Sequence, residues 1–184
     1  MSMYKKTNPT ALQSQRWLSD SLIKLMREKP YQQITIMNIC KQADLSRQTF
    51  YNLFNTKEEV LRFCLQNEYE KQFLRFCEQE KITVNEIVEA FMSVVEENRE
   101  ILELMVDNHL ENIISDEIAK CISMFTIHFI NPKKKREILP YSEVMLSGAL
   151  SHLLVYWFRQ EEAISTEQLT LLITEFLEGK LYKL

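Results

Sequence analysis

Residues 35–57 read TIMNICKQADLSRQTFYNLFNTK, which is the pattern of two short helices joined by a tight turn. In the first part, apolar residues recur at helical spacing, at Ile36, Ile39, Cys40 and Ala43. The turn is Asp44-Leu45-Ser46, and Ser46 is a favourable N-cap for a second helix that runs from Arg47 to about Phe54. This second helix should bury Phe50 and Phe54. Two such helices with a turn of about three to four residues form a helix-turn-helix.

The outer face of the second helix is polar and suits the base edges of DNA. Arg can bond a guanine edge bidentately, Gln an adenine edge, and Thr offers both a hydroxyl and a methyl group. The candidates for base contacts are Arg47, Gln48, Thr49 and Asn52. An ordinary helical hairpin with a solvated polar face has the same pattern, and that alternative stays open at this point.

Another helix begins directly after this segment, because Thr56 and Glu59 form the capping-box pattern Thr-x-x-Glu. Lys57 lies in its first turn, where a cation opposes the helix dipole, so this lysine is either a plain surface residue or serves an anion. Backbone N–H groups at a helix N-terminus can bind a DNA phosphate together with such a lysine. The hydroxyl of Tyr51, which can donate to phosphate, favours the DNA interpretation. The predicted phosphate contacts are Thr35, Ser46, Tyr51 and Lys57.

Charge is distributed unevenly along the 184 residues. The net charge is −4, which by itself argues weakly against a nucleic-acid-binding protein. Residues 1–63 carry ten Lys or Arg and five Asp or Glu, whereas residues 64–184 carry twelve and twenty-one. A basic N-terminal part joined to an acidic remainder is expected when only the first third contacts DNA. We therefore predict a DNA-binding domain at 1–63 and a second domain at 64–184.

The segment from about Leu18 to Leu61 resembles the DNA-binding domain of the tetracycline-repressor (TetR/AcrR) family of bacterial regulators. The matching residues are Leu18, Leu22, Leu25, Met26 and Tyr31, then Thr35-Ile36 with Ile39, Ala43-Asp44-Leu45-Ser46, and Thr49-Phe50-Tyr51 with Phe54 and Lys57-Glu58. The sequence departs from the family pattern at Pro30 and Asp44, where Gly is usual, and at Leu53, where His is frequent. Asp tolerates left-handed backbone angles, so the turn is retained. Leu53 removes one habitual contact to DNA.

This resemblance implies a transcriptional regulator, most often a repressor, that binds a near-palindromic double-stranded DNA operator as a homodimer. It also implies a small-molecule effector in the C-terminal domain that changes the spacing of the two DNA-binding domains. By linkage, such an effector must favour one spacing through its differential affinity, typically about 1–3 kcal/mol. A helical body can also accept a partner protein in place of a small molecule, which would make the chain a co-regulator, and this alternative stays open.

Helical patterns continue through the rest of the chain, and only two Gly and four Pro punctuate it. A first helix is expected at about 10–29. The helix that begins at Thr56 should continue past Phe76, and about twenty-four helical residues would span about 36 Å. Capping boxes at Thr83-x-x-Glu86 and Ser165-x-x-Gln168 start two later helices.

These patterns predict an all-α fold. It consists of an N-terminal three-helix helix-turn-helix DNA-binding domain, a long connecting helix, and a C-terminal helical domain for effector binding and dimerisation. Between the two capping boxes we expect a short helix from about Asn98 to Val106 and a longer one to about Ile130. The basic run at 133–136 is interpreted as a solvated loop, although such a run could also bind an acidic surface or nucleic acid.

The last two predicted helices favour an interface between two copies of the chain. Residues 144–158 are apolar on nearly every side, and this stretch is too short for a membrane span of about twenty residues. A helix buried on all sides within an assembly fits better, and proteins of the resembled family usually dimerise through their last two helices. The predicted interface residues are Ser147, Gly148, Ser151, Leu169, Leu172, Ile173 and Phe176. Packing of both helices on their own subunit remains the alternative.

An effector site should combine aromatic bulk with a few polar groups. The candidate pocket residues are Met105, His109, Phe125, Phe129, Tyr156 and Trp157, each of which could equally be a core residue.

Other classes of function find little support in the sequence. The four cysteines lack Cys-x-x-Cys spacing and the three histidines lack an i, i+4 partner, so no metal site is expected. No nucleophile motif or phosphate loop is present, and we expect neither an enzyme nor a cofactor. Residues 1–9 are polar and basic rather than a signal sequence, so we expect a cytoplasmic protein without a membrane partner.

Overall fold

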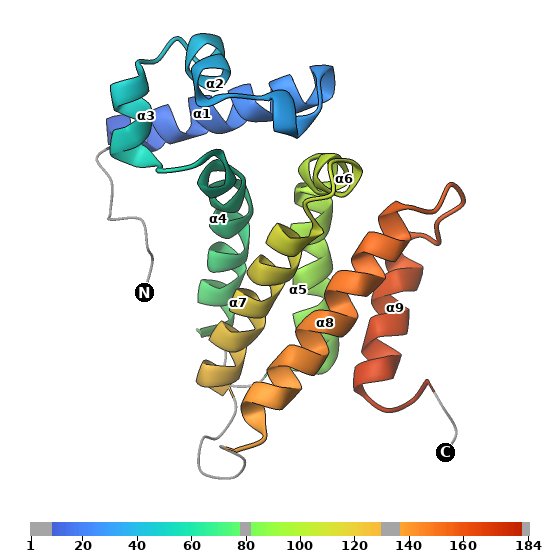
Figure 1. The fold of residues 1–184 in the computed structure, drawn as a ribbon. Coiled ribbons are helices and arrows are strands. Elements are labelled where there is room, and N and C mark those ends of the chain that lie inside the picture. The colour runs from blue at the N-terminus through green and yellow to red at the C-terminus, as the bar shows by residue number, and fades with distance from the viewer. Residues whose placement is uncertain (1–8, 78–81, 130–136, 182–184) are drawn as a thin grey trace. The chain divides into compact units, whose positions relative to one another are not determined.

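The computed structural model describes residues 9–77, 82–129 and 137–181, except for the side chains of residues 67–75, 77 and 127–129. Within this part of the chain all regular structure is helical, as predicted (Figure 1). The chain forms two compact units, Met1–Leu65 and Gln66–Leu184, and the division falls inside helix α4 (Lys57–Cys77). The predicted basic loop at 133–136 lies outside the described residues.

Unit 1 contains the three helices of the predicted helix-turn-helix domain and the start of α4. Helix α1 (Pro9–Glu28) packs against α2 (Ile36–Gln42) and α3 (Arg47–Leu53), and a short 3₁₀ turn, η1 (Tyr31–Gln33), connects α1 to α2. Apolar residues one helical turn apart in α1, such as Leu18 and Leu22, are fully buried. Phe50 of α3, which packs against α1, is also buried, as is Phe54, so the predicted burial of these two rings is confirmed.

The turn between α2 and α3 is a Schellman motif, in which the residue after the C-cap adopts a left-handed conformation. Asp44 is that residue, with φ of 52°. The Leu45 N–H donates to the Cys40 carbonyl at 2.9 Å, and the Asp44 N–H donates to the Lys41 carbonyl at 3.4 Å. The expectation that Asp44 keeps the turn in place of the usual Gly is confirmed by this geometry.

Helix starts are where local sequence signals were most informative. The capping boxes at Thr83 and Ser165 both form, starting α5 (Val84–Glu97) and α9 (Thr166–Leu177). The box at Thr56 differs from the prediction. The Glu59 N–H donates to Thr56 Oγ1 at 3.2 Å, as in a capping box. The Glu59 carboxylate, however, accepts from the backbone N–H of Asn55 at 2.8 Å and not from the N–H of the cap residue Thr56.

Unit 2 is a layered helical body. Helix α7 (Glu111–Phe129) packs along α8 (Leu139–Phe158), α5 packs against α9, and the short α6 (Arg99–Asp107) contacts α5, α7 and α8 (Figure 1). Buried aliphatic side chains come from every one of these helices, among them Met92, Ile113, Leu154 and Leu169. No helix in the described part of the chain is both long and apolar enough to cross a membrane.

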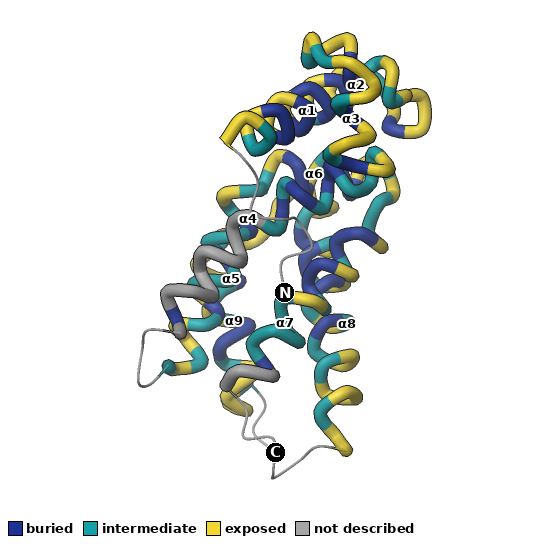
Figure 2. The backbone as a smooth tube through the Cα atoms, turned by 90° about the vertical axis from the view of Figure 1, so that its left-hand side faces the viewer, coloured by how far each residue is buried: buried dark blue, intermediate teal, exposed yellow. Residues whose placement is uncertain are grey.

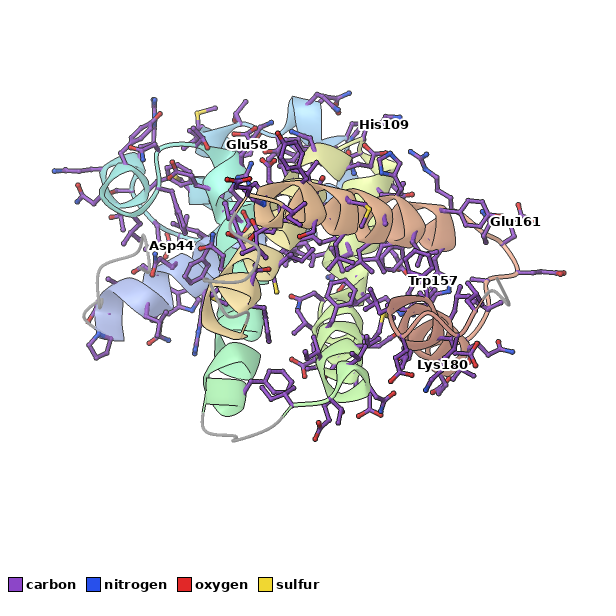
Figure 3. All side chains as sticks on the ribbon, turned by 90° about the horizontal axis from the view of Figure 1, so that it is seen from below. Asp44, Glu58, His109, Trp157, Glu161 and Lys180 are labelled. Carbon is purple, nitrogen blue, oxygen red and sulfur yellow. The ribbon has the colours of Figure 1, made fainter. Side chains whose placement is uncertain are left out.

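A cluster around Arg99 fixes the turn between α5 and α6 to the connection between α8 and α9. The Arg99 guanidinium donates to both carboxylate oxygens of Glu96, at 2.6 and 2.9 Å, and lies 4.5 Å from the centre of the Trp157 ring. The hydrogen bond from Arg99 holds the pKa of Glu96 below its usual value. Trp157, labelled in Figure 3, donates its indole N–H to the Ile164 carbonyl at 2.7 Å.

His109 occupies the same position in its turn as Asp44 does in the helix-turn-helix. Its φ is 58°, and Leu110 N–H donates to the Met105 carbonyl at 2.9 Å, which completes a Schellman motif after α6. His109 projects from the surface there (Figure 3). A side chain with a Cβ is strained at this φ, whereas Gly is not.

His109→Gly is therefore expected to raise the free energy of unfolding by about 0.5–1 kcal/mol, measured from the urea midpoint. His109→Ala is the control, because it removes the imidazole but keeps a Cβ, and it should leave stability unchanged or lower it. Equal stability of the Gly and Ala variants would show that backbone strain at this residue is not the cause.

Candidate nucleic-acid interface

Helix α3 presents a polar outer face above an aromatic core. Arg47, Gln48 and Asn52 are exposed, Thr49 is partly exposed, and the Tyr51 side chain stands between them half-exposed. On the inner side, the Phe50 ring lies 5.9 Å from the ring of Phe54, and the Phe54 ring lies 5.6 Å from that of Phe63. All four predicted base-contact residues therefore lie on accessible sides of one helix that is anchored by buried aromatic rings.

The predicted phosphate-contact hydroxyls at Thr35 and Ser46 have a structural role as N-caps. Ser46 Oγ accepts from the Thr49 N–H at 2.9 Å, and Thr35 Oγ1 accepts from the Asn38 N–H at 3.2 Å. The box at Thr35 is completed by the Asn38 side chain, a partner that sequence reasoning missed because Glu or Gln is the usual residue there. Both caps remain exposed at the N-termini of α2 and α3, where backbone N–H groups and the helix dipole favour anions.

The sequence suggested that the Lys57 ammonium faces solvent or an anion, whereas in the structure it bonds to backbone carbonyls. Its ammonium donates to the carbonyls of Tyr31 and Ile34, at 2.7 and 2.9 Å, so two of its three N–H bonds are directed into the protein. Nζ also lies 3.9 Å from the centre of the Tyr31 ring. Burial lowers the pKa of Lys57, and the neighbouring Glu58 opposes that shift.

Tyr31 connects Lys57 to the next residue of α4. Its buried hydroxyl donates to Glu58 Oε1 at 2.8 Å. Burial and the carboxylate partner both raise the pKa of Tyr31 above its usual range. Burial alone would raise the pKa of Glu58, but the hydrogen bonds from Tyr31 and from the start of α4 bring it below its usual value. Glu58 therefore stays ionised at neutral pH and remains an acceptor for Tyr31.

The candidate pocket residues of unit 2 differ in their exposure. Met105 and Trp157 are buried and Phe125 is half-buried, with its ring 5.6 Å from that of Phe76. His109 and Tyr156 have exposed side chains: His109 lies in the turn after α6, and Tyr156 lies on the outer side of α8. The Phe129 side chain lies outside the described residues.

Glu117 on α7 is a buried charged residue that sequence reasoning missed. Its carboxylate accepts from Lys120 Nζ at 2.6 Å and from Gln66 Nε2 at 3.2 Å. Its burial arises from long-range packing, and nothing in its immediate sequence distinguishes it from a surface glutamate. Among the described residues, no group of His, Cys, Asp and Glu side chains has the arrangement of a metal site.

The predicted dimer-interface residues differ in their exposure. Ser147, Ser151, Leu169 and Ile173 are buried within the chain itself. Small residues do let helices approach closely, but α8 has a close neighbour in α7 of the same chain, and α9 has one in α5. Gly148 and Leu172 are partly exposed, and Phe176 is exposed.

Comparison with known proteins bears directly on this site. The family model described as "Bacterial regulatory proteins, tetR family" matches residues 19–63, which include α2, the turn and α3. The helix-turn-helix part of this chain therefore resembles the TetR family. The match falls on the helix-turn-helix whose exposed polar face is described above.

Two curated relatives are named as HTH-type proteins that regulate transcription. The chain is 30% identical over 69 residues to the HTH-type dhaKLM operon transcriptional activator DhaS of Lactococcus lactis subsp. lactis (strain IL1403), covering 38% of this chain and 37% of that protein. It is 20% identical over 171 residues to the uncharacterized HTH-type transcriptional regulator YxbF of Bacillus subtilis (strain 168), covering 89% of this chain and 44% of that protein. The chain thus spans less than half the length of these two relatives.

Solved structures show the same fold along nearly the whole chain. Lin0861 from Listeria innocua superposes with a TM-score of 0.73 at 18% identity, covering 95% of this chain and 94% of that one. A TetR transcriptional regulator from Streptococcus agalactiae 2603V has a TM-score of 0.59 at 17% identity, covering 91% of this chain and 95% of that one.

Proposed function

We propose that this TetR-family regulator binds a near-palindromic DNA operator as a homodimer, inserting α3 of each copy into a major groove. The observation that carries the proposal is the exposed polar face of α3 above the fully buried Phe50, in a unit matched by the family model. A rigid helix with an accessible polar side is what major-groove recognition requires.

The residues of α3 and its flanks divide into two groups. Arg47, Gln48, Thr49 and Asn52 are proposed to contact base edges, because their side chains carry the donors and acceptors that distinguish base pairs. Thr35, Ser46 and Tyr51 are proposed to contact phosphates, which set register and orientation without reading sequence. The net positive charge of residues 1–63 supports the attraction to DNA that such contacts need.

Dimerisation is proposed to use the outer face of α8, which we define as Ile138, Tyr141, Met145, Ala149, His152 and Tyr156. These residues are spaced three or four apart, so they lie on one side of the helix, opposite the buried Leu154. All are exposed, and exposed positions recur along α8 in Figure 2. A contiguous exposed apolar surface of this kind marks an interaction site. A second copy is the fitting occupant because a near-palindromic operator needs two recognition helices related by symmetry.

Effector control is proposed to act in unit 2, where Met105, Phe125 and Trp157 supply apolar bulk. Repression is proposed as the direction of regulation, because the resembled family consists mostly of repressors. The DhaS relative is named an activator, which is the opposite direction. Reporter transcription from the bound promoter decides between the two. A co-regulator that binds a partner protein is the second candidate, and the α8 outer face is the observation that favours it, since another protein could cover that face instead.

Arg47→Ala tests the proposed reading of bases. It should weaken operator binding by about 1–3 kcal/mol if the contact is bidentate, and relax base preference at one position in each half-site. The measurement is duplex binding at low salt with single-base operator variants. Arg16→Ala, at an exposed position on α1, is the control and should leave base preference unchanged. A uniform loss across all sequences in Arg47→Ala would contradict base recognition by this residue.

A further inference from the structure

The start of α4 is bound to the turn that precedes α2. Lys57 donates to the Tyr31 and Ile34 carbonyls, and the Tyr31 hydroxyl donates to Glu58. We call these four residues the Tyr31–Lys57 cluster. Tyr31 and Ile34 are 3% and 2% exposed, so the cluster is formed largely inside unit 1.

The chemistry of the cluster makes it a strong connection. Each of its three hydrogen bonds has one charged partner, and such bonds are shorter and stronger than neutral ones. Lys57 gains a further interaction from the face of the Tyr31 ring. A cation at the N-terminus of α4 opposes the dipole of its own helix. Here it is compensated by the carbonyls of Tyr31, the first residue of η1, and of Ile34, its C-cap.

The position of the cluster in the chain gives it a consequence for recognition. One side of the cluster, residues 31–34, precedes α2 by one residue, and the other side, residues 57–58, begins α4, three residues beyond the end of α3. The helix-turn-helix is therefore closed into a loop whose two ends are held together by the cluster. A recognition helix that is held at both ends keeps a fixed direction. Fixed direction matters because functional side chains must be held within about 0.5 Å of their working positions.

We propose that Tyr31 and Lys57 are positioning residues for DNA recognition, which fix the direction of α3 from behind without contacting DNA. The proposal rests on the proposed function. It replaces the sequence-based expectation that Lys57 is a phosphate contact, because two of the three N–H bonds of its ammonium are already used inside the protein.

The two roles of Lys57 differ in their dependence on salt. A lysine that neutralises one phosphate adds about 0.9 to the slope of log K against log salt concentration, since counterions are released. A positioning residue changes the affinity but not the number of phosphates neutralised. Tyr31 offers an independent measurement, because its side chain is buried and its hydroxyl carries no charge.

The experiment compares operator binding by Tyr31→Phe, Lys57→Met and the double variant over a range of salt concentrations, at a temperature where circular dichroism shows each protein folded. Tyr31→Phe should bind about five to ten times more weakly, the equivalent of losing one intramolecular hydrogen bond, and Lys57→Met, which loses two, should bind at least as weakly. The salt slope should equal that of the wild type. The double variant should bind no more weakly than the weaker single variant, since both changes release the same connection. Lys24→Met removes one charge from an exposed position on α1 and is the control for net charge.

The outcomes separate the alternatives. If Tyr31→Phe binds like the wild type while Lys57→Met loses about 0.9 of the salt slope, Lys57 is a phosphate contact and the proposal is overturned. Wild-type affinity in both variants also overturns it. If Lys57→Met does not fold, Tyr31→Phe decides alone, because it removes a single hydroxyl. Failure of the wild-type protein to bind any operator is a different result, and it would refute the proposed function itself.

Discussion

Met145→Asp is expected to leave each chain folded but to convert the dimer into a monomer. Met145 is 72% exposed and central on the α8 outer face, so its replacement disturbs no internal packing. In the proposed dimer this position becomes buried next to the partner's copy of the same face. An unpaired carboxylate buried there costs several kcal/mol per subunit after relaxation, which is enough to dissociate an interface of ordinary affinity.

Loss of the dimer should also weaken operator binding strongly. Two linked recognition helices bind a two-part site about 10²–10⁴ times more tightly than one alone, through effective concentration. The measurements are light scattering at micromolar concentration and binding to full and half operators. Full-site affinity should fall towards half-site affinity, while half-site affinity stays the same.

Val144→Asp is the matched control for this experiment. Val144 is as exposed as its neighbour, at 73%, but one residue along a helix turns the side chain by about 100° away from the α8 outer face. The control should remain a dimer. A dimeric Met145→Asp protein, or a wild-type protein that is monomeric at micromolar concentration, would refute the interface.

Phe50→Ala is expected to unfold the helix-turn-helix at physiological temperature. The Phe50 side chain is 0% exposed and contacts the aromatic core of unit 1. Truncating a buried Phe to Ala typically costs about 3–5 kcal/mol, from lost transfer energy and the cavity left behind. A domain of this size is stabilised by only about 5–10 kcal/mol. One substitution should therefore remove most of the stability of unit 1, and DNA binding with it.

Thermal unfolding followed by circular dichroism measures this effect. Unit 2 should keep its helicity, so the variant should show two separate transitions. Tyr51→Ala is the control at the next position, where the half-exposed ring contributes little to the core, and it should change stability by about 0.5–1 kcal/mol at most. A melting curve for Phe50→Ala that matches the wild type would contradict the assigned core.

Local signals in the sequence were enough to predict the helix-turn-helix. Caps such as Ser46 act within a few residues, and the spacing that buries Phe50 depends only on helical periodicity. For the same reason the start of α3, the capping box at Thr83 and the left-handed turn at Asp44 agree with the structure. These features need no knowledge of distant parts of the chain.

Features that depend on long-range packing could not be predicted in the same way. Helix α8 is apolar on nearly all sides, so periodicity could not tell which face α7 covers or that Ser147 is buried. The context of Lys57 indicated an anion, but its partners are carbonyls 23 and 26 residues earlier in the chain. His109 was grouped with aromatic residues by composition, whereas its backbone conformation places it in an exposed turn.

Selection of bound sequences from a pool of random DNA duplexes tests the central claim most directly. We predict enrichment of a two-fold symmetric site whose half-site centres are separated by about one helical turn, 10–10.5 base pairs, or a multiple of it. Arg47→Ala should broaden one position in each half of that site. Absence of any enriched sequence, or enrichment of a single site without symmetry, would contradict a dimer that reads DNA through α3.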